Sequence, residues 1–376
     1  MSEVRVNNLS NENNTGGPTI SGITTFSGSN FLVPPVGDTA SRPDNCPPGS
    51  LRFNTDSAHL EYYRGDGIGW VEIEAELTAP LGGTGGGGTG NRMIFMGGTD
   101  GSGVVDVIQF VTISTTANAT DFGDLLAGEQ EGASCSSHLR GFYFGGDPSD
   151  NDIEFVTFAS LGNATDFGNC TAVSKSGSGC SDQTRGIMQL GASFSDTINY
   201  ITMATTGDAV DFGDQGNTEG GMNCFSSPTR GIMGGAHPAN TPRIEFITIA
   251  TTGNSQEFGS LMHDQELSAA ASSATRGVWM GGRYAPSPTN MSTIQYVQIQ
   301  SLGNSMEFGD LTSVRNDSGG MSDCVRAVCY GGGNPDGQVD TIEYISISTG
   351  GTAIDFGNAN HSQGYACTSN GHGGLG

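Results

Sequence analysis

The chain has 376 residues, and 39 Asp and Glu against 14 Lys and Arg give it a formal net charge of −25 at pH 7. No segment forms a basic stripe that could hold a phosphate backbone, which excludes nucleic-acid binding. The 61 glycines have no collagen-type period and favour tight turns between many short strands. No apolar run is long enough to span a membrane and no secretory leader is visible, so we expect synthesis in a cytosol without membrane insertion.

The N-terminal quarter predicts three segments. Residues 1–34 are polar and contain too few apolar side chains to fold alone, so we expect an extended arm that becomes ordered on a partner. Residues 35–77 alternate apolar and polar residues between Asp- and Gly-containing turns, which predicts a small three-stranded β-meander. Residues 78–90 form a Gly-rich flexible linker.

One motif recurs six times in the rest of the chain. Each copy has an arginine, usually followed by glycine, then apolar residues and Gly-Gly, a variable loop, Ile-x-aromatic-apolar-Thr-apolar, and Asp/Glu-Phe-Gly. The copies begin at Arg92, Arg140, Arg185, Arg230, Arg276 and Arg326, at intervals of 48, 45, 45, 46 and 50 residues. A period of this length with strand-like units is typical of radial or stacked β architectures.

Each copy predicts four strands. The first strand is rich in small residues, as a crowded centre requires, and the third is apolar on both faces, as expected between two neighbouring sheets. The first copy lacks a first strand, but residues 364–370 match the first strand of the second copy, residues 132–137. We therefore predict an all-β chain in which residues 91–376 form a six-bladed β-propeller closed by the C-terminal strand.

The repeats resemble a known family over residues 91–376. A Gly-Gly pair that ends a strand, a period near 50 residues and a four-stranded unit are similar to the kelch repeat. The resemblance implies a kelch-like propeller.

The cysteines of the repeats share a position with other small apolar residues. Cys135, Cys180 and Cys367 occupy the slot that holds Ala271 and Met321 in other copies. A slot that accepts Cys, Ala and Met requires a modest apolar side chain, so we expect buried free thiols. No metal-binding C-x-x-C spacing occurs.

Two charged positions recur in every copy. One is the initial arginine, and the other is the acid of the Asp/Glu-Phe-Gly triplet: Asp121, Asp166, Asp211, Glu257, Glu307 and Asp355. The arginines could form a ligand-binding ring. Recurrence in every copy favours the alternative, in which ion pairs or Arg-to-carbonyl contacts join neighbouring strands.

The loops after Gly-Gly vary most between copies, and variable loops on a rigid scaffold usually carry recognition. The candidate binding residues are His237, Arg283, Tyr284, Asp150 and Asp336. Solvated connectors without a ligand are the alternative. Asp-rich stretches at 100–106, 147–152 and 336–340 have the composition of calcium loops but not the full ligand spacing, so we predict no metal.

No catalytic motif or cofactor fingerprint is present, which predicts neither a catalytic site nor a cofactor. A pocket assembled from several repeats is beyond the reach of a motif search.

The N-terminal residues carry a second resemblance. The segments 49–56 (GSLRFNTD), 60–63 (LEYY) and 69–73 (GWVEI) resemble a module common in tail-fibre and baseplate proteins of tailed phages. The segments 16–18 (GGP) and 31–35 (FLVPP) are similar to leaders of such proteins in phages of marine cyanobacteria. The resemblance implies that residues 1–76 dock on other virion proteins and present a distal domain.

These observations predict a virion structural protein, such as a tail-fibre or appendage component, in several copies or as a homo-oligomer. Its propeller would bind a host-surface glycan. The alternatives are a head or neck decoration protein with a purely structural role and a propeller enzyme that acts on polysaccharide.

Overall fold

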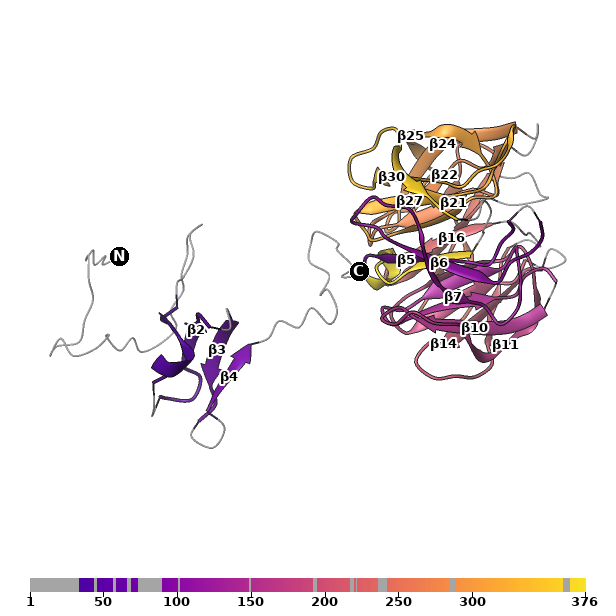
Figure 1. The fold of residues 1–376 in the computed structure, drawn as a ribbon. Coiled ribbons are helices and arrows are strands. Elements are labelled where there is room, and N and C mark those ends of the chain that lie inside the picture. The colour runs from indigo at the N-terminus through magenta and orange to yellow at the C-terminus, as the bar shows by residue number, and fades with distance from the viewer. Residues whose placement is uncertain are drawn as a thin grey trace. The chain divides into compact units, whose positions relative to one another are not determined.

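The computed structural model describes residues 34–73 and 90–376, except residues 44–45, 57–58, 66–68, 101, 149, 192–194, 217–219, 221, 236–241, 285–288 and 361–365. The chain divides into two compact units, Met1–Glu76 and Leu77–Gly376 (Figure 1). Apart from residues 34 and 90, the expected arm and linker lie outside the described residues. Within the described part of the chain, no helix is long and apolar enough to cross a bilayer.

The first unit contains one small sheet in the order β1-β2-β3-β4. The predicted meander supplies β2 (Leu51–Asn54), β3 (His59–Tyr63) and β4 (Trp70–Ile73) in antiparallel register. Strand β1 (Val36–Gly37) adds a short parallel pairing to β2, and a 3₁₀ turn, η1 (Thr39–Ser41), follows it.

A buried carboxylate organises this sheet. Glu61 is buried and forms ion pairs with Arg42 at 2.6 Å and Arg52 at 3.3 Å, and the Asn54 amide donates to it at 3.3 Å. Burial would raise the pKa of Glu61, but the hydrogen bond and charge of Arg42, with Asn54 and Arg52, hold that pKa below its usual value. A buried charge is stable only with its partners in place, so these arginines hold together a sheet with a very small apolar core.

The second unit is built from six sheets, one for each repeat, and the all-β prediction is confirmed. Each has four main antiparallel strands, which we number from the innermost outward. The innermost strands of sheets 1 to 6 are β32 (Ala366–Ser369), β8 (Ala133–Ser136), β12 (Ser178–Ser181), β16 (Asn223–Ser226), β21 (Ala269–Ser272) and β26 (Gly319–Ser322). The second strands are β5 (Arg92–Met96), β9 (Arg140–Phe144), β13 (Arg185–Gln189), β17 (Arg230–Gly234), β22 (Arg276–Met280) and β27 (Arg326–Tyr330).

The outer half of each sheet carries the apolar and aromatic residues of the repeat. The third strands are β6 (Val107–Thr112), β10 (Asp150–Thr157), β14 (Thr197–Thr202), β18 (Arg243–Thr248), β24 (Thr289–Gln298) and β30 (Thr341–Ser346). The fourth strands are β7 (Thr120–Asp124), β11 (Thr165–Ser174), β15 (Val210–Asp214), β19 (Gln256–Ser260), β25 (Met306–Arg315) and β31 (Ile354–Asn358). Short strands β20 (Gln265–Glu266) and β23 (Arg283–Tyr284) extend sheet 5, and β28 (Gly333–Asn334) pairs with β29 (Gly337–Gln338).

The innermost strands are neighbours in a closed cycle. They contact one another in the order β32-β8-β12-β16-β21-β26, and β26 contacts β32. The predicted pairing of the C-terminal strand with the first repeat is confirmed, because β32 pairs with β5 from Ala366 opposite Met96 to Ser369 opposite Met93. The first and last parts of this unit therefore share sheet 1.

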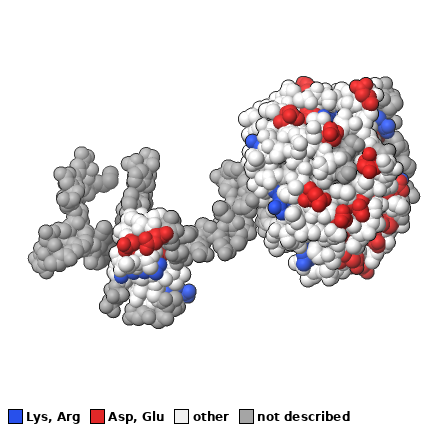
Figure 2. All heavy atoms as spheres, viewed as in Figure 1, with Lys and Arg blue, Asp and Glu red and all other residues white. Residues whose placement is uncertain are grey.

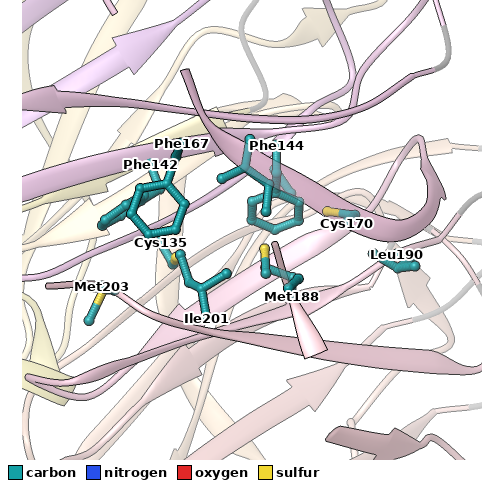
Figure 3. Close-up of a cluster of buried hydrophobic side chains, with 12 residues drawn as sticks. Cys135, Phe142, Phe144, Phe167, Cys170, Met188, Leu190, Ile201 and Met203 are labelled. Atoms are coloured by element: carbon teal, nitrogen blue, oxygen red, sulfur yellow. The ribbon is translucent and has the colours of Figure 1, made fainter. Parts of the chain in front are cut away.

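The apolar core lies between neighbouring sheets rather than under one of them. One cluster packs Cys135, Phe142 and Phe167 of sheet 2 against Met188 and Ile201 of sheet 3 (Figure 3). Five similar clusters fill the spaces between the other neighbouring sheets, including the space between sheets 6 and 1. This arrangement explains why the third strand of each repeat is apolar on both faces.

The described cysteines are free, as predicted. Of the eight, all but Cys46 are buried, and Cys135, Cys180 and Cys367 lie within the clusters between sheets. Burial in this apolar setting raises the pKa of the Cys135 thiol, so it remains protonated at neutral pH.

A ring of serine hydroxyls joins the innermost strands. The last residue of each of these strands is serine, and each hydroxyl donates to the backbone carbonyl of the corresponding serine in the preceding sheet, at 2.5–2.8 Å. The members are Ser136, Ser181, Ser226, Ser272, Ser322 and Ser369. Because Ser369 is the member from β32, the ring is complete only when the tail is in place.

A second ring lies at the third strands. The x residue of each Ile-x-aromatic motif uses a side-chain oxygen to accept a backbone N–H from the preceding sheet, at 2.8–3.1 Å. These residues are Gln109, Glu154, Asn199, Glu245, Gln295 and Glu343. This position was not among the predicted contacts, although every copy has a side-chain carbonyl or carboxylate there between an isoleucine and an aromatic residue.

A third contact explains the Phe-Gly part of the triplet. The Phe carbonyl accepts a backbone N–H from the next sheet in five of the repeats, as from Gly162 to Phe122 at 2.9 Å. A Cβ atom on the glycine that follows would come within 2.1–2.6 Å of the neighbouring backbone in all six copies. Glycine is therefore needed because the sheets approach so closely here.

The repeated arginines bridge the sheets without their expected acidic partners. Each guanidinium donates to a backbone carbonyl of the next sheet, as from Arg185 to Ile249 at 3.0 Å, and lies over an aromatic ring at 4.5–4.9 Å. The carbonyl contact occurs for Arg92, Arg140, Arg185, Arg230, Arg276 and Arg326. The contact from Arg326 to Ile113 of sheet 1 closes this cycle as well.

The expected ion pairs are therefore wrong, and the Arg-to-carbonyl alternative is correct. Among the described residues, no ion pair joins these arginines to the triplet acids Asp121, Asp166, Asp211, Glu257, Glu307 and Asp355. All six acids are exposed on the fourth strands. An ion pair with a carboxylate that remains in water would add little stability. The guanidinium instead finds an aromatic face and a backbone carbonyl inside the interface between sheets.

We expect Arg185→Ala to destabilise the repeat unit by about 1–3 kcal/mol, because it removes the hydrogen bond to Ile249 and the contact with Tyr200. Thermal unfolding measures this change. Asp211→Ala removes an exposed acid and is the matched control, expected to melt within about 0.5 kcal/mol of the parent chain. Equal losses in the two variants would restore the ion-pair interpretation.

Candidate functional site

A cavity of about 980 Å³ lies where the innermost strands begin. Its lining includes Ala133, Ser178, Asn223, Ala270 and Cys367, which come from five of these strands. The volume is at the upper end of that of small-molecule sites. The serine ring lies at the opposite ends of the same strands.

The other end of the innermost strands is filled by the tail. In the 3₁₀ turn η3 (Gly373–Leu375), which packs against β12, β16 and β21, Leu375 is fully buried, and a Cβ atom on Gly373 or Gly374 would collide with atoms of the ring serines. His372 lies 3.1 Å from the Ser181 hydroxyl and 3.3 Å from the Ser136 carbonyl through Nε2, and its Nδ1 accepts from the Gly374 amide. This pattern requires a neutral ring with the proton on Nε2.

Four residues at the cavity rim have a strained, left-handed backbone conformation. Glu131, Ser176, Leu267 and Asp317 have φ values of 56°, 52°, 54° and 53°, and all four line the cavity. Each lies five residues before the ring serine of its sheet. The other two repeats have glycine at this position in the sequence, at 221 and 364. A non-glycine residue here costs roughly 1–2 kcal/mol, and such strain is often found at functional sites.

The rim also holds two cations with acidic partners. Lys175 lies 3.1 Å from the Asp147 carboxylate and 3.7 Å from that of Glu131. On the other side, Arg283 Nε donates to Glu266 at 2.6 Å. The two cations at the rim therefore have three acidic partners, Glu131, Asp147 and Glu266.

Asp317 is a half-buried carboxyl at this rim. Its Oδ2 accepts a hydrogen bond from the Asn316 amide at 2.9 Å. Burial raises the pKa of Asp317 to about 6; the charge of Arg283 opposes this rise, and the charges of Glu131 and Glu266 add to it. The group therefore changes charge close to neutral pH.

The candidate residues from the sequence do not form one site. Arg283 lines the cavity, and the Tyr284 ring packs against that of His263 with centroids 6.5 Å apart. Asp336 is exposed in the turn between β28 and β29. His237 lies outside the described residues. The strained rim position was not among the predicted residues; in the sequence it is marked only by glycine in two copies and larger residues in the other four.

Asp150 belongs instead to a carboxyl cluster between sheets 1 and 2. Burial, the hydrogen bond and charge of Asp150, and the charges of Glu154 and Asp152 raise the pKa of Glu129 to about 9. Within the described part of the chain, no group of three or more His, Cys, Asp or Glu side chains is arranged to hold a metal ion. Its raised pKa means that Glu129 keeps a proton at neutral pH, and a proton shared with Asp150 lets these carboxyls stay close together.

No protein-family model matches the chain, and no curated protein matches it significantly.

The carboxyl cluster predicts a pH effect on stability. Because the pKa of Glu129 is raised from 4.5 to about 9 on folding, the folded state holds an extra proton between these values, and the free energy of unfolding falls as pH rises across this range. Glu129→Gln should abolish this fall and raise the melting temperature at pH 8 by several degrees, roughly 2–4 °C per kcal/mol recovered.

Another repeat of the chain already has glutamine at the position that corresponds to Glu129. Gln265, also two residues before the strained rim position, donates its amide to the Gly281 carbonyl and contacts Gln295. Glu257→Gln, at an exposed acid, is the control and should leave the pH profile unchanged. A lower melting temperature for Glu129→Gln at pH 8 would contradict the shared-proton interpretation.

The tail predicts the opposite dependence at low pH. Burial lowers the pKa of His372 from 6.5 to about 4, with the His138 charge acting in the same direction against the Ser136 carbonyl and Asp182. The unfolded chain therefore gains a proton first, and the free energy of unfolding falls as pH drops from 6.5 to about 4. His372→Gln should flatten this limb of the curve in thermal melts. An unchanged slope would show that other groups cause it.

Proposed function

We propose that residues 91–376 form a six-bladed, kelch-like β-propeller and that the protein is a virion structural protein of a tailed phage. In this proposal it is a tail-fibre or appendage component that recognises a host-surface glycan. The architecture is supported by the cyclic order of the innermost strands and by six apolar clusters between neighbouring sheets. The cycles of serine and arginine contacts, each of which includes sheet 1, give further support.

The observation that carries the recognition role is the contrast between the constant frame and the variable cavity rim. The serine and arginine contacts repeat in all six sheets, whereas the rim position holds Glu131, Ser176, Leu267 and Asp317 in four of them. A rigid scaffold that presents different side chains around one cavity is suited to binding. The acidic surface of the repeat unit favours solubility and a partner that is not strongly anionic (Figure 2).

The N-terminal unit is assigned the anchoring role. Its support is the resemblance of residues 1–76 to the tail-fibre and baseplate module, together with a compact sheet that has its own buried ion-pair core around Glu61. In this proposal the partners of residues 1–76 are other virion proteins, and the number of docking sites on the particle sets the number of copies.

The enzyme alternative has one specific observation in its favour. A carboxyl with a pKa of about 6, as for Asp317, can act as a general acid near neutral pH, and Glu131 at the same rim could serve as its partner. A glycosidase would need both groups to reach one glycosidic bond. The decoration-protein alternative requires no ligand in the cavity.

Binding to isolated envelope polysaccharide of marine cyanobacteria separates these functions. We expect the full chain to retain the polysaccharide without generating new reducing ends. New reducing ends would establish the enzyme, and no retention would favour decoration.

Blocking the cavity should abolish that retention. Ala172→Trp places a large ring at an exposed strand position in the lining, and binding should fall at least tenfold. Val210→Trp, on the exposed start of β15, is the matched control with unchanged binding. Retention that survives Ala172→Trp would move the binding surface away from the cavity.

A further inference from the structure

All six innermost strands contribute to the wall of the cavity. Met321 of β26 adds the sixth strand to the five already described. On the side of sheet 3 the wall runs from Ser176 at the rim down to Gly179, which is three residues of extended chain or roughly 10 Å. The cavity is therefore a bowl centred on the cycle of innermost strands rather than a groove between two sheets.

The floor of this bowl is sealed. The six ring serines come next along the innermost strands, are at most 1% exposed, and are absent from the described lining. Beyond them lies η3, in which Leu375 is fully buried and Gly374 is so close to Ser181 that a Cβ atom would collide with its carbonyl. A ligand can enter only at the mouth, and it cannot pass through the ring.

The lower wall exposes backbone as well as side chains. Gly179 and Gly320 line the cavity and are partly exposed, and a glycine can present only its peptide groups and its Cα atom. Their strands, β12 and β26, each stand at the end of a sheet and lie three places apart in the cycle of six. Two open strand edges therefore face each other across the bowl.

Strand geometry fixes the direction of these peptide groups. The Ser181 carbonyl accepts from the Ser226 hydroxyl at 2.7 Å, and the Ser181 N–H donates to the same oxygen at 3.4 Å, so both groups point away from the partner strand β13. This orientation alternates along an antiparallel strand, so the N–H and carbonyl of Gly179, two residues earlier, point the same way. In β26 the Ser322 carbonyl accepts from the ring serine of sheet 1, which gives Gly320 the same orientation.

We propose that the bowl takes the terminal sugar residue of a glycan chain or branch, with its hydroxyls at the open edges of β12 and β26. A sugar hydroxyl both donates and accepts, which matches a strand edge that presents N–H and carbonyl groups together. An internal sugar has neighbours on both sides and could only lie across the mouth, roughly 10 Å above the floor. The inference rests on the proposed glycan-binding function and narrows its ligand to chain ends.

Competition for envelope polysaccharide tests which part of the glycan is bound. The parent chain is retained on immobilised polysaccharide from marine cyanobacteria in the presence of two kinds of competitor: methyl glycosides of its constituent monosaccharides, and size-fractionated fragments of the polymer. We expect at least one methyl glycoside to compete. At equal concentrations of chain ends, longer fragments should be no more than about threefold better, because their additional sugars lie outside the bowl.

Met321→Ala tests whether the ligand reaches the lower wall. Met321 is partly exposed in the cavity and directly precedes a ring serine, and Ala271 holds the same position in sheet 5, so the fold accepts alanine there. The loss of this contact should weaken competition by the methyl glycoside about fivefold or more. Met262→Ala, at an exposed side chain outside the described lining, is the control and should bind like the parent chain.

Two results would overturn the inference and leave the adhesive function in place. Competition by longer fragments alone would put an internal segment across the mouth. Competition by a methyl glycoside that Met321→Ala does not weaken would place the terminal residue at the rim. If the parent chain is not retained on the polysaccharide at all, the proposed function and this inference fall together.

Discussion

The closed ring of serine hydroxyls is the contact on which the repeat unit depends. The six short innermost strands are neighbours in the ring but form no backbone ladder with one another, since each pairs only with the second strand of its own sheet. The serine that ends each strand joins it to its neighbour, because its hydroxyl donates to the backbone carbonyl of the corresponding serine in the preceding sheet, at 2.5–2.8 Å. Each such bond contributes only about 1 kcal/mol. Because the six bonds form a closed cycle, every sheet is joined to a neighbour on both sides.

Outside the serine ring, three further kinds of contact join neighbouring sheets, and each uses different chemistry. The arginines combine a carbonyl contact with an aromatic face, the third-strand polar residues accept backbone amides, and the outermost glycines allow the backbones to touch. Apolar clusters fill the spaces between these layers. Because the frame is maintained by positions that hardly vary, the rim around the cavity is free to differ from repeat to repeat. That separation is what makes a binding role compatible with so regular a sequence.

Much of the fold could be predicted because its determinants are local and repeated. The strand positions, the buried thiols and the pairing of residues 366–369 with the first repeat follow from a pattern that recurs six times. The partners of the arginines could not be predicted from the same pattern. A recurring Arg and a recurring acid suggest a pair, but sequence spacing does not show that Asp211 stays in water while Arg185 turns over Tyr200.

The candidate site was predicted less well for a related reason. Loop variability drew attention to Asp336 and Asp150, yet a cavity on an axis is lined by residues just before the innermost strands, which look like ordinary turn residues in the sequence. Only the backbone shows that Glu131 and Asp317 share a left-handed conformation and face one cavity. The proton shared by the Glu129 cluster also depends on contacts between two repeats.

The pairing of β32 with β5 has a consequence for biosynthesis. Strand β5 leaves the ribosome some 270 residues before its partner, so during translation the opening sheet exposes an unsatisfied edge. A nascent chain at high local concentration could accept the tail of a neighbouring polypeptide instead of its own. Such an exchange would link protomers by intertwining rather than by surface contact, and assembly order would then depend on how quickly each chain is completed.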